Sequence, residues 1–161
     1  DFSDVLIVPK TSSLESRSEV DVKREFKWKH NPNRSFKNVP IIAANMDTTG
    51  SFAMAEALAP EGLLVALHKH YTAKEFADFY QDFEYPTRVF FSMGIGDSDL
   101  DKLREVLEYC DPELICIDVA NGYTKKFKNA VSTVRRMCPR SFIMAGNVVT
   151  PEKTEEIIIA G

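Results

Sequence analysis

Five short apolar runs recur along the chain, and each has the composition of a parallel strand that is buried on both faces. The runs cover residues 39–45, 63–67, 88–91, 114–119 and 142–145. They are largely continuous apolar stretches and do not alternate between apolar and polar positions, which is typical of sheets covered by helices. The pattern therefore predicts five buried strands.

The segments between these runs carry independent helix signals. Thr72 and Glu75 have the spacing of a capping box at the start of a helix. Asp99 is expected to cap a second helix, and Thr150 followed by Pro151 a later one. The apolar positions expected on the inner helical faces are Phe76, Phe79, Tyr80, Phe83, Leu100, Leu103, Leu107, Phe127, Ala130, Val131 and Val134. Strands and helices thus alternate in the order βαβαβαβαβα.

The ends of the predicted strands recur every 22 to 29 residues, at Asp47, His70, Gly96, Asp118 and Asn147. This spacing is typical of βα units with short loops. We predict an α/β chain that forms the first five units of a (β/α)8 TIM barrel. Residues 1–161 would be the N-terminal part of one catalytic domain, truncated before the sixth strand. A doubly wound sheet is disfavoured, because Asp99 stands where a dinucleotide fingerprint needs a third glycine after Gly94 and Gly96.

Three shorter apolar stretches precede the first barrel strand, at residues 5–8, 20–22 and 26–28. Pro9, a serine-rich patch and Arg17 separate them. We expect these stretches to form an N-terminal β-hairpin, which would either plug the floor of the barrel or lie beside its mouth.

The composition of the chain mainly excludes classes of function. Twenty basic and 24 acidic side chains give the chain a formal net charge of −4, so no global positive field is available for nucleic acid or an anionic membrane. No apolar run approaches the roughly 20 residues of a membrane span, and we expect a cytoplasmic protein. Cys110, Cys116 and Cys138 lack the paired spacing of disulfide frameworks or zinc sites, so reduced, buried thiols are expected.

Active-site groups of a barrel lie where the strands meet the loops that follow them. We single out Lys69 and Asp118 among the polar strand ends. A cation at the mouth could hold a phosphate or assist a leaving group, and Asp118 could pair with it or transfer a proton. The alternatives that stay open are structural: a helix cap (Asn45, Asp47), a solvated loop (residues 68–70) and a turn (residues 118–122). No third ligand at metal spacing accompanies His68 and His70, so no metal site is expected.

Six ordered stretches resemble the successive motifs of the GMP reductase family, within the superfamily that also contains IMP dehydrogenase. They are DFSDVLIVPK, SRSEVDV, VPIIAANMDT, ALHKHYT, ICIDVANGY and IMAGNVVTPE. NMDT and HKHY favour the reductase branch. IMP dehydrogenases generally carry a pair of CBS domains after the second barrel strand, whereas here Tyr71 leads directly into a short helix and Arg88. The chain therefore has no CBS insertion at this point.

The resemblance implies NADPH-dependent reductive deamination of GMP to IMP and ammonia by a homotetramer. In that reaction an enzyme cysteine attacks purine C2, and hydride from NADPH reduces the covalent intermediate. The positions that match cofactor contacts of the family are Ser16, Arg17, Lys69, Asp118, Val119 and Ala120. Lys69 and Asp118 would also assist the departure of ammonia. The catalytic cysteine and a possible potassium site would follow residue 161, and none of the cysteines present matches that nucleophile.

Two other functions stay open: an IMP dehydrogenase without CBS domains, and a non-catalytic partial barrel that binds nucleotides. The chain departs from the family at Met93 and Ile95, where small hydroxyl residues usually surround the glycine loop after the third strand. We therefore expect a less polar loop at this point of the mouth.

Overall fold

Five parallel strands form the central sheet of a computed structural model that describes residues 2–161. They are β3 (Ile42–Ala43), β4 (Leu64–Ala66), β5 (Val89–Met93), β6 (Leu114–Asp118) and β7 (Phe142–Gly146). Each pairs with the next one along the chain, without a reversal of order. A doubly wound sheet reverses its strand order at a switch point, whereas a barrel does not. The predicted fold class is confirmed as part of a TIM barrel.

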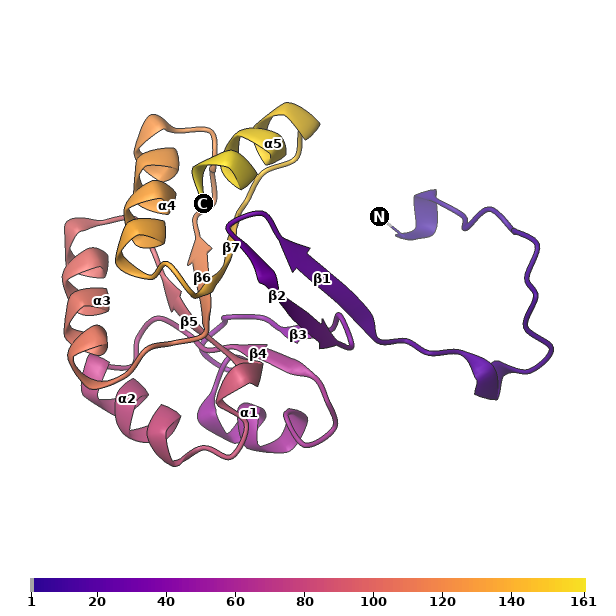
Figure 1. The fold of residues 1–161 in the computed structure, drawn as a ribbon, viewed down its shortest axis with the longest axis horizontal. Coiled ribbons are helices and arrows are strands. Elements are labelled where there is room, and N and C mark those ends of the chain that lie inside the picture. The colour runs from indigo at the N-terminus through magenta and orange to yellow at the C-terminus, as the bar shows by residue number, and fades with distance from the viewer. Residues whose placement is uncertain (1) are drawn as a thin grey trace.

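A helix follows each of these strands. The helices are α1 (Phe52–Leu58), α2 (Ala73–Asp82), α3 (Asp97–Tyr109), α4 (Lys125–Met137) and α5 (Pro151–Ala160), with a short 3-10 turn, η3 (Pro86–Arg88), before β5. In Figure 1, α2, α3 and α4 lie along one side of the sheet. The capping box of Thr72 and the cap of Thr150 before Pro151 are confirmed.

The predicted cap at Asp99 is wrong. Helix α3 begins at Asp97 and its N-cap is Gly96. The carboxylate of Asp99 instead lies in the first turn and accepts a hydrogen bond from the backbone N–H of Gly96 at 2.8 Å. Aspartate suits this position as well, because a negative charge in the first turn of a helix interacts favourably with the helix dipole.

The predicted hairpin exists, but most of its expected strands are wrong. It pairs β1 (Arg24–Trp28) with β2 (Asn31–Asn38) in antiparallel fashion. Residues 5–8 and 20–22 form no strand. Only the third apolar stretch, residues 26–28, belongs to the hairpin.

The hairpin closes the floor of the barrel. Trp28 and Phe36 pack against Phe142, the first residue of β7, at ring-centroid distances of 5.0 and 6.0 Å. Arg34 pairs with Glu113, which immediately precedes β6. These contacts lie at the N-terminal ends of the strands, so the mouth at the opposite ends stays open to a ligand.

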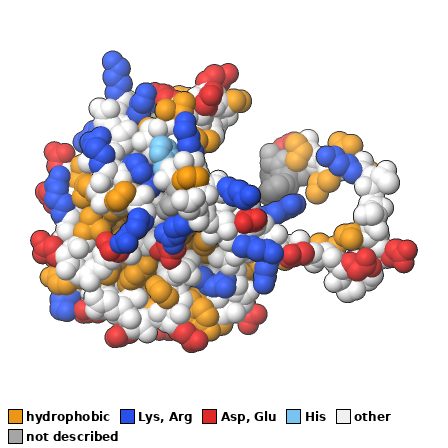
Figure 2. All heavy atoms as spheres, in the orientation of Figure 1, with side chains coloured by type: hydrophobic (Ala, Val, Ile, Leu, Met, Phe, Trp, Pro, Cys, Tyr) orange, Lys and Arg blue, Asp and Glu red, His pale blue; other side chains and the backbone are white. Residues whose placement is uncertain are grey.

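Residues before β1 form an extended arm with two short 3-10 turns, η1 (Phe2–Asp4) and η2 (Arg17–Glu19). Figure 1 shows this arm extending away from the barrel, and Figure 2 shows apolar side chains along it. Leu6 and Ile7 are each 96% exposed. Within residues 2–161, no helix is long and apolar enough to cross a membrane.

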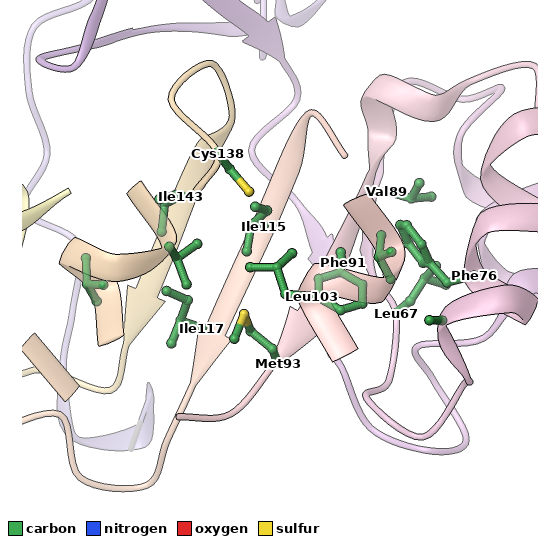
Figure 3. Close-up of a cluster of buried hydrophobic side chains, with 14 of the residues drawn as sticks. Leu67, Phe76, Val89, Phe91, Met93, Leu103, Ile115, Ile117, Cys138 and Ile143 are labelled. Carbon is green, nitrogen blue, oxygen red and sulfur yellow. The ribbon is translucent and has the colours of Figure 1, made fainter. Parts of the chain in front are cut away.

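The sheet has a distinct core on each face. The larger one lies between sheet and helices, and Figure 3 shows Phe91, Ile115 and Ile143 of three strands packing there with Phe76 and Leu103 from the helices. The smaller one fills the barrel interior near its floor and contains Leu64, Ala66, Phe90, Leu114, Cys116 and Phe142. Because side chains alternate between the faces of a strand, each of the strands β4 to β7 contributes to both cores, and this double burial explains their continuous apolar runs.

Candidate functional site at the barrel mouth

The C-terminal ends of β3, β6 and β7 enclose a hollow of about 420 Å³ at the barrel mouth. Its polar lining includes Asn45, Asp118 and Asn147, while Ile42 and Met144 supply apolar walls. Of the sequence-predicted site residues, Asp118 therefore lines the hollow directly. An open concavity with a few polar groups on apolar walls is typical of small-molecule sites.

Asp118 is held by a residue from the far side of the sheet. The amide Nδ2 of Asn45 donates a hydrogen bond to Asp118 Oδ2 at 3.0 Å. Asn45 follows β3 and Asp118 ends β6, so two strands lie between them. In a flat sheet, three strand spacings would separate them by roughly 14 Å. The hydrogen bond therefore exists because the sheet curls, and it bridges the mouth.

Lys69 lies on the loop after β4, and its side chain is exposed. The ammonium of Lys102 on α3 donates a hydrogen bond to the backbone carbonyl of Lys69 at 2.6 Å. His70 Nε2 lies 3.1 Å from Asp47 Oδ1, which ties the same loop to the end of β3. Within residues 2–161, Lys69 and Asp118 form no ion pair. The structure therefore does not show the pairing of these two residues that the sequence left open.

A stack of aromatic rings packs against the loop that carries Lys69. The ring of His68 lies 4.0 Å from that of Tyr71, which lies 3.7 Å from Phe52. Phe52 in turn stacks on Phe79 at 4.2 Å. The hydroxyl of Tyr71 also accepts a hydrogen bond from the backbone N–H of Phe52. The loop that carries Lys69 is therefore fixed by α1 and α2, and residues 68–70 are not simply a solvated loop.

Asn45 and Asp47 do not cap the helix that follows them. Ser51 is the N-cap of α1, and its hydroxyl accepts a hydrogen bond from the backbone N–H of Met54. Asn45 and Asp47 instead contact Asp118 and His70 at the mouth. The capping interpretation is wrong because a closer hydroxyl satisfies the helix end.

Gly122 allows two mouth loops to come into contact. Its N–H donates to the carbonyl of Asn147 at 2.9 Å. A Cβ at this position would lie 2.5 Å from the same oxygen and 2.9 Å from Val148 Cγ1. The turn after Asp118 therefore needs glycine for close approach, and residues 118–122 are both a turn and a part of the mouth.

Ser16 and Arg17 are not brought to the mouth within this chain. Both lie on the exposed N-terminal arm, where the hydroxyl of Ser16 caps the short η2 turn. Val119 and Ala120 lie directly after Asp118 on the mouth loop, and Ala120 is exposed. Of the six predicted cofactor-contact positions, four lie at the mouth ends of β4 and β6, although Val119 packs against the core between sheet and helices, and two are on the arm.

Met93 and Ile95 do not line the mouth hollow. Both belong to the core between sheet and helices, and Met93 is 2% exposed. They are apolar because they pack against helices. The apolar loop composition thus has a structural cause.

None of the three cysteines is suited to nucleophilic attack. Burial raises the pKa of the Cys110, Cys116 and Cys138 thiols to about 11 each. The nucleophile of cysteine chemistry is the thiolate, which these thiols do not form near neutral pH. Cys110 and Cys138 follow the ends of helices and Cys116 lies in β6, as expected from the sequence. Within residues 2–161, no group of three or more His, Cys, Asp or Glu side chains is arranged to hold a metal ion.

Two contacts at the mouth were missed by sequence reasoning. Asn45 was expected at a polar strand end, with a helix cap as the alternative, but its hydrogen bond to Asp118 was not predicted. Lys102 had no such signal, because it lies on a helix 33 residues from its partner Lys69.

Comparison with known proteins gives one consistent family. Residues 1–161 match the IMP dehydrogenase / GMP reductase domain. The chain is 49% identical to a GMP reductase of Klebsiella pneumoniae and 47% identical to one of Vibrio vulnificus. In both cases the match covers 99% of this chain and 47% of the relative. The chain thus spans about half the length of the curated relatives it matches.

A solved structure agrees with the fold. The crystal structure of inosine 5′-monophosphate dehydrogenase from Legionella pneumophila superimposes with a TM-score of 0.81 at 28% sequence identity. The superposition covers 99% of this chain and 47% of that protein.

Proposed function

This chain belongs to the IMP dehydrogenase/GMP reductase family, and we propose that the protein containing it is a GMP reductase that converts GMP to IMP and ammonia with NADPH. The observation that carries the proposal is the mouth itself. Asn45, Asp118 and the Lys69 loop, which come from three separate motifs of the resemblance, occur at one end of one sheet. The identity of 47–49% to relatives named GMP reductase supports the reductase branch.

The residues at the mouth fit a nicotinamide nucleotide. The hollow offers a carboxylate and amides beside apolar walls, which suits the polar ribose and the flat ring of such a cofactor. Bound NADPH supplies the hydride of the reaction. On this proposal, Asn45 orients the Asp118 carboxylate, and the Lys69 ammonium donates a proton to the amine as it leaves.

Several finer features come from the family resemblance. They are NADPH as the specific hydride donor, a homotetrameric state, a cytoplasmic location, and a nucleophilic cysteine with a possible potassium site beyond residue 161. Ser16 and Arg17 on the exposed arm would then contact the cofactor. The raised pKa values of the three cysteines present support a nucleophile elsewhere.

The test is product analysis with the full-length protein. We expect GMP-dependent oxidation of NADPH with stoichiometric IMP and ammonia. The similarity to the Legionella pneumophila dehydrogenase makes an IMP dehydrogenase the second candidate, so IMP with NAD is assayed in parallel. Turnover of IMP with NAD and none of GMP would replace the proposal by a dehydrogenase. The absence of both activities in folded protein would leave a non-catalytic barrel.

A further inference from the structure

A second hollow beside the mouth collects positive charge. It has a volume of about 430 Å³ and lies between the N-terminal halves of α4 and α5. Its lining is Tyr123, Lys125, Lys128, Asn129, Lys153 and Glu156. Three lysines against one glutamate leave two uncompensated positive charges, in a chain whose net charge is −4. We call this feature the lysine hollow.

Glu156 organises two of these lysines. Its carboxylate lies 2.9 Å from Lys128 Nζ and 2.8 Å from Lys153 Nζ. Hydrogen bonds from both ammonium groups lower the pKa of the Glu156 carboxyl to about 2. Because each ammonium has three donors, one bond to Glu156 leaves donors for another acceptor. Glu156 therefore holds Lys128 and Lys153 in place, and both ammonium groups keep hydrogen-bond donors for another acceptor.

Lys153 is unusual for its burial. The residue is only 9% exposed, and its ammonium lies 5.9 Å from the centre of the Tyr123 ring. Lysine is rarely buried to this extent without full pairing, yet Lys153 shares its one carboxylate with Lys128. A largely buried lysine residue that shares its one carboxylate partner with a second lysine keeps hydrogen-bond donors for a further anion.

The sequence of α4 places lysines against the helix dipole. Its first turn contains Lys125 and Lys126 and no acidic residue. Positive charge at a helix N-terminus is unfavourable, whereas α2, α3 and α5 each carry an acidic residue in the first turn. An anion in the lysine hollow would offset this repulsion, because helix N-termini attract anions.

The lysine hollow adjoins the mouth through a shared loop. The hydroxyl of Tyr123 accepts hydrogen bonds from the backbone N–H groups of Val149 and Thr150, each at 3.0 Å. Tyr123 follows the mouth loop of Asp118, and Val149 follows Asn147 of the mouth lining. A ligand bound at the mouth therefore lies close to this charge.

We propose that the lysine hollow is a binding site for phosphate groups, in which Lys125, Lys128 and Lys153 hold the phosphate of a small phosphorylated ligand. Two kinds of ligand could supply the phosphate: a dinucleotide that extends from the mouth, and a separate phosphorylated metabolite. Phosphate fits better than a carboxylate, because a dianion or trianion matches the two excess positive charges.

The test is calorimetric titration of the full-length protein with inorganic pyrophosphate, at fixed ionic strength and without magnesium. Lys125→Gln removes a charge that lines the hollow, and Lys126→Gln removes the same charge from the neighbouring residue, which does not line it. We expect saturable binding that Lys125→Gln weakens by about tenfold, the usual effect of one charge-assisted hydrogen bond. Lys126→Gln should weaken it far less.

The controls separate binding from folding and from general charge attraction. Both variants should melt at or slightly above the wild-type temperature without ligand, since each removes a cation from a helix N-terminus. Pyrophosphate should raise the melting temperature of the wild type and of Lys126→Gln, but raise that of Lys125→Gln less. Equal losses in the two variants, or no saturable binding in the wild type, would overturn the proposal.

A pyrophosphate titration in saturating NADPH shows which of the two phosphate ligands the hollow binds. Competition between pyrophosphate and NADPH assigns the hollow to the phosphates of the cofactor, and undiminished binding assigns it to a separate ligand. Both results retain the phosphate site. The site is also independent of the proposed reaction, because pyrophosphate binding is measured in the absence of turnover and would persist if reductase activity were not found.

Discussion

The substitution Gly50→Ala should damage the mouth by a steric effect that the structure defines closely. Gly50 lies on the loop after β3, and its carbonyl accepts a hydrogen bond from His68 N–H at 2.8 Å. A Cβ on Gly50 would lie 2.3 Å from the carbonyl oxygen of Ala66, 2.9 Å from His68 N and 3.0 Å from the carbonyl oxygen of Ala44. All three atoms belong to the backbone of strand ends, so no side chain can rotate away.

The expected cost follows from two contributions. Forcing extra volume into a packed site costs about 1–3 kcal/mol. Separating the loop from the end of β4 also weakens the hydrogen bond to His68, which contributes about 1 kcal/mol. We therefore expect Gly50→Ala to lower the free energy of unfolding by roughly 2–4 kcal/mol, equivalent to a fall in melting temperature of roughly 3–6 °C for a protein about twice as long as this chain. The same shift displaces the loop that carries Lys69.

Thermal unfolding of the full-length protein measures this effect, with Gly146→Ala as the matched control. A Cβ on Gly146 would have its nearest neighbour at 3.8 Å, an ordinary contact, so the control should melt near the wild-type temperature. Gly50→Ala should also lower turnover, because the displaced loop carries Lys69. If Gly50→Ala has the melting temperature of the wild type, the close approach of the loops after β3 and β4 is not present in the folded protein.

Three further outcomes are expected in the full-length protein. Lys69→Ala should reduce turnover by about 100-fold or more with a stability change within about 0.5 kcal/mol, because the side chain is exposed; wild-type turnover in folded enzyme would remove Lys69 from the reaction. Asp118→Asn should slow deamination or hydride transfer in single-turnover experiments at an unchanged melting temperature, and unchanged rates would leave Asp118 as a turn residue. Glu156 has a carboxyl pKa of about 2, below the ordinary 4.5, so its stabilisation is complete above pH 4.5 and disappears as the pH falls toward 2. Glu156→Gln should therefore make the free energy of unfolding less dependent on pH between 4.5 and 2. An unaltered pH dependence of stability would contradict the pairing with Lys128.

Sequence periodicity predicted the barrel strands well because their environment is uniform. A strand covered on both faces must be apolar throughout, and β5 and β6 are read from that property alone. Strand β2 carries the residues NPNRSFKN, which have no alternation of apolar and polar positions. It pairs with β1 because Phe36 and Trp28 pack on Phe142, more than 100 residues later in the chain. Such a tertiary cause leaves no local pattern to detect.

The position of the mouth followed from the rule that barrel sites lie at strand ends, but the contacts within it did not. Of the two residues selected by strand-end placement, Lys69 lies on the loop after β4 and Asp118 ends β6 and lines the hollow. Which residues hold them depends on packing between units, as with Lys102 on α3 and the carbonyl of Lys69. Helix surface positions such as Lys102 look alike in sequence, whether they are solvated or serve a neighbouring loop.

The hydrogen bond between Asn45 and Asp118 connects fold and site more directly than any other contact. It joins residues 73 positions apart across two intervening strands, and it can form only if the sheet is curved. At the opposite end of the strands, Trp28 and Phe36 of the hairpin pack against Phe142 on the concave face of the same sheet. The placement of the Asp118 carboxylate therefore follows from the closure of the sheet toward a barrel, and not from residues that are its neighbours in the sequence.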